Sequence, residues 1–202
     1  MRPRISGTEG YAQEAPDLLK AYEKIAVEDV HNPVLHLIPT TPSRLLDIGA
    51  GTGRDAARFA ELGHRVVAVE PVDELRQGAM ALHPSKNIEW IADSLPDLPV
   101  VEARGETFDV VLLTAVWMHL DERQRSQAMP IVASLVQAGG VLIMSLRHGP
   151  IPKGRRMFDV SAEETIALAK AERLSCVVNT LTGSVQAGKD DVTWTRVAFR
   201  KA

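Results

Sequence analysis

The sequence is short of several residue types, and each shortage excludes a class of protein. Only one of the 202 residues is a cysteine, so no disulfide can form within the chain. No apolar run approaches the ~20 residues that a membrane-spanning helix needs. The net charge is −3 at pH 7, which gives no general attraction to nucleic acid or to anionic membranes. We therefore expect a cytoplasmic protein with no nucleic-acid partner and no membrane partner.

The single cysteine, Cys176, begins a strand-like run with Val177 and Val178. Free cysteines are commonly buried and behave as small apolar side chains, so we expect Cys176 to be buried. The histidines show no metal-ligand spacing, because His64, His83 and His119 fall on separate predicted elements. The sequence therefore predicts neither a structural disulfide nor a metal site.

Apolar residues are plentiful, at 45% of the chain, and their spacing predicts alternating strands and helices. The expected strands are residues 44–48, 65–70, 88–92, 108–114, 140–146, 176–182 and 192–200. The expected helices between them are residues 53–62, 73–82, 121–138 and 161–173. Near-continuous apolar strands separated by helices are typical of a parallel sheet covered on both faces. We therefore expect a doubly wound α/β domain with a seven-stranded, mostly parallel sheet and one antiparallel strand in a closing hairpin.

The N-terminal residues do not follow this alternation. Residues 1–10 are polar and rich in Gly, Arg and Pro, and we expect them to form a mobile tail. Apolar residues at three- and four-residue spacing predict a helix over 14–30, and Pro33 predicts a break before a short second helix. We therefore divide the chain into an N-terminal helical segment, 1–40, and a ligand-binding domain, 41–202.

The first strand runs into the most informative stretch of the chain, Leu45-Leu46-Asp47-Ile48-Gly49-Ala50-Gly51-Thr52-Gly53-Arg54-Asp55. Three glycines at alternate positions allow a sharp turn and a close approach of a ligand to the backbone. A dinucleotide-binding turn has the pattern G-x-G-x-x-G, but Arg54 holds the place of its third glycine. The observed spacing, acid-x-G-x-G-x-G, favours another nucleotide-type ligand over a dinucleotide.

This stretch resembles the first motif of the class I S-adenosylmethionine-dependent methyltransferases. Later stretches resemble further motifs of that family in the same order, and they are Val66–Glu70, Ile91–Leu95, Phe108–Thr114 and Leu135–Leu142. The resemblance extends over about residues 40–202. It implies a Rossmann-like fold, S-adenosyl-L-methionine as cofactor with S-adenosyl-L-homocysteine as product, and an N-terminal segment that acts as a lid.

The resemblance also implies roles for three acids at the ends of successive strands. Asp47 would help to hold the amino group of the cofactor, Glu70 would bind the ribose hydroxyls, and Asp93 would face the adenine amino group. A carboxylate suits the second role because it accepts hydrogen bonds from two adjacent hydroxyls. The predicted cofactor-binding residues are Asp47, Gly49, Ala50, Gly51, Gly53, Arg54, Asp55, Glu70, Pro71, Asp93, Ser94, Leu95 and Thr114.

Methyl transfer from a sulfonium is an in-line displacement, so the acceptor must be held near the methyl group and in some cases must lose a proton. Trp117 could contact the sulfonium or pack in the core, and His119 could be a general base or a structural histidine. Arg147 and His148 begin a basic cluster that could bind a carboxylate or phosphate, or could be a solvated loop. The candidate catalytic residues are therefore His119, Trp117, Arg147 and His148.

These features predict a methyltransferase with a small-molecule acceptor, in the form of a monomer or a homodimer. Residues 114–117 read Thr-Ala-Val-Trp and not the Asp/Asn-Pro-Pro-aromatic motif of amino-directed DNA methyltransferases. Two tyrosines in the N-terminal segment, Tyr11 and Tyr22, are weaker candidates for the site. Two alternatives stay open: a protein or peptide acceptor, and a non-catalytic module that binds the cofactor and regulates a partner.

Overall fold

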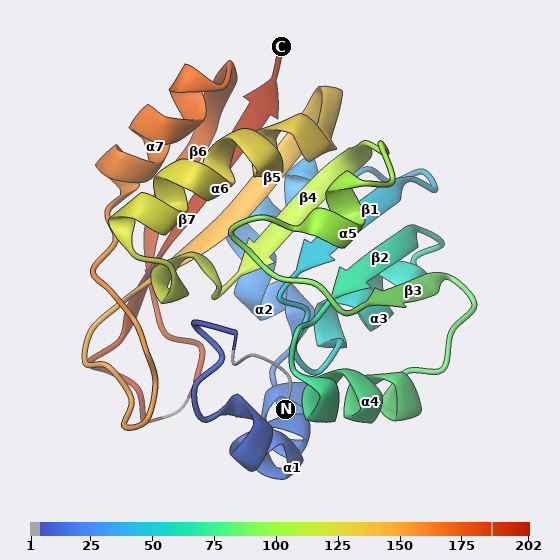
Figure 1. Ribbon diagram of the computed structural model, residues 1–202, viewed down its shortest axis with the longest axis vertical. Coiled ribbons are helices and arrows are strands. Elements are labelled where there is room, and N and C mark those ends of the chain that lie inside the picture. The colour runs from blue at the N-terminus through green and yellow to red at the C-terminus, as the bar shows by residue number, and fades with distance from the viewer. Residues whose placement is uncertain (1–4, 187) are drawn as a thin grey trace.

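A seven-stranded sheet forms the centre of the computed structural model, which describes residues 5–186 and 188–202 (Figure 1). The strand order is β3-β2-β1-β4-β5-β7-β6. The strands are β1 (Arg44–Ile48), β2 (Arg65–Val69), β3 (Ile88–Ile91), β4 (Phe108–Thr114), β5 (Val136–His148), β6 (Leu174–Gly183) and β7 (Thr193–Lys201). Strands β1 to β5 are parallel, and β7 is antiparallel to both β5 and β6. The predicted fold class is confirmed.

Helices cover both faces of the sheet, because its strands carry apolar side chains on both sides. One face packs against α5 (Pro99–Glu102), α6 (Glu122–Leu135) and α7 (Ala162–Ala171), which lie in front of the sheet in Figure 1. The other face packs against α2 (Val27–His31), the 3₁₀ turn η2 (Asn32–Leu37) and α3 (Arg54–Glu61). A further 3₁₀ turn, η3 (Trp117–His119), links β4 to α6.

Two further helices lie near the carboxyl ends of the parallel strands. They are α1 (Tyr11–Ala21) and α4 (Asp73–Leu82), which pack against each other at the bottom of the view in Figure 1. Their contact contains a small apolar cluster of Ala15, Val72 and Leu75. Gly78 of α4 leaves room for Leu19 of α1, since a Cβ at Gly78 would collide with the Leu19 side chain. The N-terminal segment is thereby fixed across one edge of the sheet.

The N-terminal segment differs most from the sequence-based prediction. In place of one helix over 14–30, α1 gives way to a 3₁₀ turn, η1 (Tyr22–Lys24), before α2 begins. Ile25 and Ala26 adopt extended backbone angles, and this break separates the two helices. Residues 5–10 form turns, and residues 5–8 line a cavity, so a mobile tail is the wrong description for them, while residues 1–4 lie outside the described residues.

Cys176 is a second correction, because its side chain is exposed and not buried. It lies on β6, which is the last strand of the sheet and is exposed along most of its length. An edge strand has a neighbour on one side only, so its apolar side chains receive less cover than those of the central strands. The sequence pattern of β6 indicated a strand but did not show its position at the edge.

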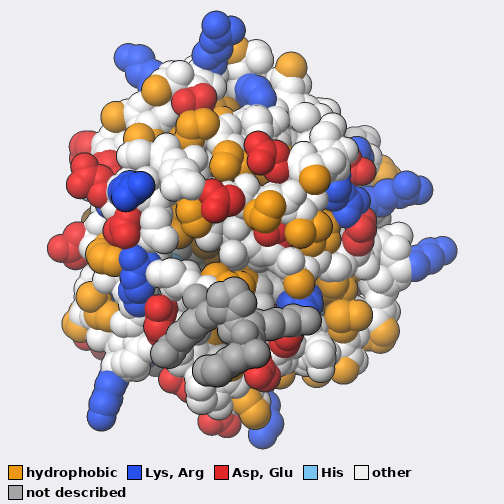
Figure 2. Space-filling model, in the orientation of Figure 1, with side chains coloured by type: hydrophobic (Ala, Val, Ile, Leu, Met, Phe, Trp, Pro, Cys, Tyr) orange, Lys and Arg blue, Asp and Glu red, His pale blue; other side chains and the backbone are white. Residues whose placement is uncertain are grey.

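The surface shows no segregation of charge on the face seen in Figure 2, where acidic, basic and apolar side chains are interspersed. Within the described part of the chain, no helix is both long and apolar enough to span a membrane. The same residues contain no group of three or more His, Cys, Asp or Glu side chains arranged to hold a metal ion.

Candidate functional site

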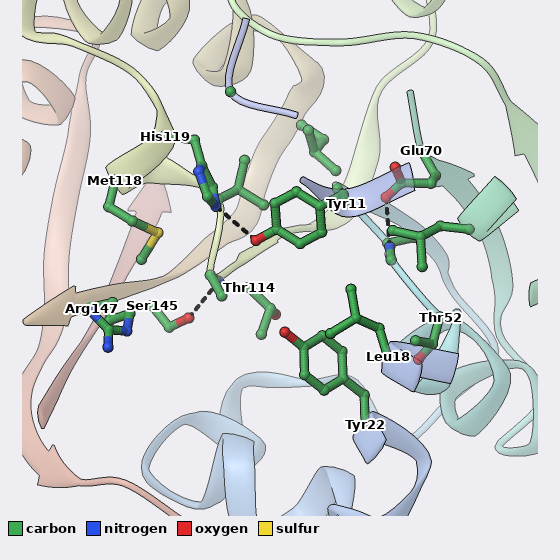
Figure 3. A pocket seen from close by; sticks show the side chains of 18 of the residues that line it. Tyr11, Leu18, Tyr22, Thr52, Glu70, Thr114, Met118, His119, Ser145 and Arg147 are labelled. Atoms are coloured by element: carbon green, nitrogen blue, oxygen red, sulfur yellow. Dashed lines mark hydrogen bonds between the residues drawn. The ribbon is translucent and has the colours of Figure 1, made fainter. Parts of the chain in front are cut away.

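A cavity of about 470 Å³ lies at the carboxyl ends of the parallel strands, beneath the N-terminal segment. The turns after β1, β2, β3 and β4 line it on the sheet side, and Tyr11, Leu18 and Tyr22 line it on the other (Figure 3). In that view Glu70 and Thr52 lie on one side of the cavity and Arg147 and Ser145 on the opposite side. Ligand sites in open α/β sheets lie at this edge, because loops from several strands converge there.

The glycine-rich turn after β1 brings the backbone to the cavity wall. The amides of Gly49 and Ala50 both donate to the carbonyl of Val69 at the end of β2, at 2.8 and 2.9 Å. Gly51 has a φ of +58°, and a Cβ built on it would meet no neighbouring atom closer than 4.0 Å. Because Gly51 lines the cavity, the open space beside it is available to a ligand.

Asp47 lies beneath this turn and is 2% exposed. Its Oδ2 atom has no hydrogen-bond partner among the described residues, although the side chain lines the cavity. Burial, together with the nearby charge of Asp55, raises the pKa of the Asp47 carboxyl well above its usual range. A buried acceptor without a donor is costly, and a ligand ammonium group would supply the missing donor.

Glu70 follows β2 and faces the same part of the cavity. One of its oxygens accepts from the amide of Gly51 and the other from the amide of Val72, each at 2.8 Å. Burial raises the pKa of Glu70 to about 7. A carboxylate oxygen can accept a second hydrogen bond, so Glu70 keeps the capacity to receive two hydroxyl donors.

Asp93 lines the cavity after β3, but its carboxylate is occupied by the backbone of its own loop. Oδ1 accepts from the amide of Ser94 at 2.9 Å, and Oδ2 accepts from the amides of Val100 and Val101 at 2.8 and 2.9 Å. These bonds fix the loop that carries Ser94 and Leu95, and both of these residues also line the cavity.

A buried ionic group connects the glycine turn to the N-terminal segment. Asp55 accepts from Nε2 of His31 at 2.6 Å, from Arg54 and, at 3.2 Å, from the hydroxyl of Thr114. His31 and Arg54 hold the pKa of Asp55 below its usual range in spite of its burial. The Asp55 charge is thus already compensated within the protein. Together, Asp47, Asp55, Glu70 and Asp93 are called the acidic half of the cavity below.

His119 lies on η3 between the N-terminal segment and the loop that follows β5. Its Nδ1 donates to the carbonyl of Arg156 at 2.8 Å, and its Nε2 lies 3.1 Å from the Tyr11 hydroxyl (Figure 3). Burial lowers the pKa of His119, so the ring is neutral near pH 7. A carbonyl can only accept, so the Nδ1–H tautomer leaves Nε2 to accept from Tyr11.

The Tyr11 ring is held in place by Arg155. The Arg155 guanidinium carbon lies 3.9 Å from the ring centroid, and the same guanidinium makes a two-point ion pair with Glu14 at 3.1 and 2.6 Å. Burial raises the pKa of Tyr11. Its hydroxyl therefore stays protonated and serves as a donor to His119.

Two arginines line the cavity beyond His119, on the neighbouring strands β5 and β7. Arg147 was predicted as a site residue, whereas Arg196 was not. Arg196 is 3% exposed; its Nε donates to the carbonyl of Val30 at 2.8 Å, and its Nη1 has no partner among the described residues. His119, Arg147 and Arg196 are called the basic half of the cavity below.

Three predicted site residues lie outside the cavity lining. Trp117 is fully buried in the core against the α6 face, so it does not contact a ligand there. His148 faces a separate small pocket, because β5 continues to this residue and successive side chains point to opposite faces. Gly53 begins α3 with a φ of +80°, and a Cβ there would lie 2.7 Å from the Trp90 ring, so its role is in packing.

The other predicted site residues line this one cavity. They are Asp47, Gly49, Ala50, Gly51, Arg54, Asp55, Glu70, Pro71, Asp93, Ser94, Leu95, Thr114, His119 and Arg147. Their roles toward a ligand stay predictions, and Tyr11, Tyr22 and Arg196 join them in the lining.

Residues 46–144 match the family model described as the methyltransferase domain. This part of the chain is thus similar to a methyltransferase domain. Solved structures that share its fold are described with bound S-adenosylhomocysteine or S-adenosylmethionine. This region contains the glycine turn and the three strand-end acids, the same motifs that carried the resemblance in the sequence.

The chain is also similar in sequence to proteins named as methyltransferases. An uncharacterized methyltransferase of Mycobacterium tuberculosis is 32% identical over 106 residues, which is 52% of this chain and 40% of the relative. Glycine N-methyltransferase of Oryctolagus cuniculus is 27% identical over 175 residues, which is 73% of this chain and 59% of the relative. The chain thus spans roughly half the length of these curated relatives.

A solved structure shows the same fold over the whole chain. It is 1,6-didemethyltoxoflavin-N1-methyltransferase of Burkholderia thailandensis, with bound 1,6-didemethyltoxoflavin and S-adenosylhomocysteine. The TM-score is 0.65 at 22% identity, and the match covers 100% of this chain and 93% of the solved one.

Proposed function

We propose that this chain is an S-adenosylmethionine-dependent methyltransferase whose methyl acceptor is a small molecule. The observation that carries the proposal is the unpartnered, buried Oδ2 of Asp47 beside the open space at Gly51. With Glu70 one strand away, this arrangement suits a ligand that carries an ammonium group and two adjacent hydroxyls. The cofactor has both features, and it supplies a methyl group already activated on a sulfonium.

The residues of the acidic half would bind and orient the cofactor. Asp47 would accept from its ammonium group, and Glu70 would accept from the ribose hydroxyls while its own backbone contacts hold it in place. The loop fixed by Asp93 would line the nucleoside end. The N-terminal segment would exclude water from the reacting atoms.

Tyr11 and His119 would remove a proton from an acceptor that has one to lose. The Tyr11 oxygen would take the proton from the acceptor while the Tyr11 proton passes to the free lone pair on Nε2 of His119. The Nδ1–H bond to the carbonyl of Arg156 holds the ring in the tautomer that this transfer needs.

The size and closure of the cavity favour a small acceptor over a protein or peptide. Ligand sites of ~300–1,000 Å³ suit small molecules, and this cavity of about 470 Å³ is covered by the N-terminal segment. The rabbit relative is named for glycine as its acceptor and the Burkholderia enzyme for 1,6-didemethyltoxoflavin, both of them small molecules.

The test has a binding arm and a turnover arm. Calorimetric titration with S-adenosylhomocysteine is expected to give a micromolar dissociation constant, and no heat at millimolar ligand would contradict cofactor binding. A panel of small acids, amines and phenols, with S-adenosylmethionine, is then monitored for release of S-adenosylhomocysteine. Turnover of peptides but not of metabolites would contradict a small acceptor, and binding without any turnover would favour a regulatory module.

A further inference from the structure

The two halves of the cavity differ in how their charges are compensated. Of the cavity's arginines, Arg54 pairs with Asp55 and Arg155 pairs with Glu14. Arg147 and Arg196 make no ion pair within 4.0 Å among the described residues. The basic half therefore holds positive charge that the described part of the protein does not neutralise by contact.

Arg196 is the more unusual of the two because it is almost completely buried. It is 3% exposed, and its only hydrogen bond among the described residues runs from Nε to the carbonyl of Val30. Burial lowers the pKa of Arg196 to about 10, which still leaves the guanidinium charged at neutral pH. The nearby Asp55 carboxylate partly opposes this lowering, but it makes no ion pair with Arg196. A buried cation without a direct ion-pair partner is unfavourable, and an anionic ligand would reduce that cost.

The sheet register places Arg196 where an acceptor would lie. Thr114 at the end of β4 pairs with Ser145 on β5, and Ser145 pairs with Arg196 on β7. Paired residues share a face of the sheet, so these three form a row across the cavity wall. Trp194, two residues before Arg196 on the same face, supplies an aromatic surface beside it.

The carboxylate of the cofactor is a less suitable partner for Arg196. In the order β1-β4-β5-β7, Arg196 is three strand spacings from Asp47, or ~14 Å between backbone positions. The ammonium and carboxylate groups of an amino acid are attached to one carbon. An ammonium held at Asp47 therefore keeps the adjoining carboxylate nearer to β4 than to β7.

We propose that Arg196 binds a carboxylate of the methyl acceptor, so that the enzyme selects small, planar or aromatic carboxylic acids. The Nη1 atom donates to the carboxylate, Arg147 adds a second positive charge nearby, and Trp194 packs against the apolar part of the acceptor. This inference rests on the proposed function because it identifies the bound anion as the methyl acceptor. The anion site itself can be tested without turnover.

The probes are benzoate and benzamide, which have nearly the same shape and differ in charge. Calorimetric or fluorescence titrations are run on the free protein and on the protein loaded with S-adenosylhomocysteine. The unsubstituted protein is expected to bind benzoate at least tenfold more tightly than benzamide. In Arg196→Met this preference is expected to fall to about one, and in Arg196→Lys part of it is retained.

The ratio of the two affinities separates charge recognition from structural damage, which would weaken both probes alike. Arg58→Met, on the exposed face of α3, is the matched control and keeps the preference. Thermal unfolding shows whether each variant folds. If Arg196→Met does not fold, Arg196→Lys provides the test.

Two results would overturn the inference. One is an unsubstituted protein without preference for benzoate, and the other is a preference that survives in Arg196→Met. If that surviving preference is accompanied by a loss of S-adenosylhomocysteine affinity of more than tenfold, Arg196 is assigned to the cofactor. If S-adenosylhomocysteine fails to bind while the Arg196-dependent preference is present, the proposed function fails and the anion site stands.

Discussion

The acidic and basic halves of the cavity leave opposite groups without partners. In the acidic half the unpartnered atom is a carboxylate oxygen of Asp47, and in the basic half it is a guanidinium nitrogen of Arg196. The first requires a donor and the second requires an acceptor. One cavity can thus hold two ligands of different charge and fix which of them lies at each end.

The difference between the halves also reflects strand direction. The acidic half comes from turns after parallel strands, where polar side chains collect because the strands end there. In the basic half, Arg196 lies inside the antiparallel strand β7 and reaches the cavity from the middle of an element. The residues of the two halves thus reach the cavity from different kinds of position in the sheet, although Asp55 is near enough to Arg196 to raise the pKa of its guanidinium.

The largest effect is expected for His119→Ala, which removes the proposed proton acceptor in the basic half. Turnover should fall by a factor of about 100 or more, as is usual for loss of a general base. Affinity for S-adenosylhomocysteine should change little, because His119 is not among the acids that would hold it. Steady-state kinetics and calorimetry on the same preparation check both statements.

Tyr11→Phe is the companion variant, because it keeps the ring on Arg155 and removes only the hydroxyl. If Tyr11 passes the proton, the loss of turnover should approach that of His119→Ala. Normal turnover in both variants would return the pair to a structural role.

A smaller effect is expected for Asp47→Ala and Glu70→Ala in the acidic half. Each should weaken binding of S-adenosylhomocysteine by about 1–3 kcal/mol, through the loss of a charge-assisted hydrogen bond. The benzoate preference of the basic half should be unaffected. Glu172→Ala, at a partly exposed acid after α7, serves as the control in calorimetry. Unchanged affinity in both acid variants would refute their roles.

Alanine substitutions at two glycines of one turn, Gly51 and Gly53, should differ in their effect on S-adenosylhomocysteine affinity by up to about tenfold. Both have positive φ, so alanine at either costs roughly 1–2 kcal/mol of stability. Gly51→Ala places its Cβ beside the cavity and should weaken S-adenosylhomocysteine binding about tenfold. Gly53→Ala places its Cβ against Trp90, so it should lower the melting temperature further while affecting the affinity less. Equal affinities in the two variants would contradict the proposed position of the cofactor.

The pH dependence of stability offers a test of burial in the acidic half. Burial raises the pKa of Glu70 from 4.5 to about 7, so between these values the folded state binds more protons than the unfolded state. The free energy of unfolding contributed by Glu70 therefore falls as pH rises from about 5 to 7. Glu70→Gln should make urea-unfolding curves less dependent on pH over this range, and an unchanged dependence would contradict the assigned pKa.

The smallest effect is expected for the contact that holds the N-terminal segment closed. The Glu14 side chain is half exposed, and exposed ion pairs contribute ~0–1 kcal/mol. Glu14→Gln should therefore raise the S-adenosylhomocysteine dissociation constant by no more than about fivefold, with faster protease cleavage near the N-terminus. Glu28→Gln breaks a comparable exposed pair with Arg58 away from the cavity and should change neither value.

The acidic half could be predicted from the sequence because its positions follow from a local rule. Strand-end residues of parallel neighbours meet at one edge, so Asp47, Glu70 and Asp93 came together as expected. The basic half depends on which strands become neighbours and on register, which local patterns do not contain. His148 lies outside the cavity lining because β5 extends beyond its predicted end, so that His148 and Arg147 are successive residues of one strand with side chains on opposite faces.

Arg196 did leave a signal in the sequence that could have been used. It interrupts the run Thr193-Trp194-Thr195-Arg196-Val197-Ala198-Phe199, whose last three residues are fully buried. A charged residue inside a strand of this kind either lies on a solvated face or has a function within the protein. The sequence alone does not distinguish these two possibilities, and the antiparallel position of β7 beside β5 in the structure decides between them.

The hydrogen bond from Arg196 to the carbonyl of Val30 has a consequence for redesign. One guanidinium of the cavity lining anchors the N-terminal segment through Nε and leaves Nη1 without a partner among the described residues. The residues that the Nε bond joins are 166 positions apart in the sequence. A lysine has a single nitrogen and cannot occupy both places. An engineer who replaces Arg196 to accept a neutral acceptor therefore also loosens the segment that covers the site. A second substitution that reattaches Val30 would be needed to retain a closed cavity.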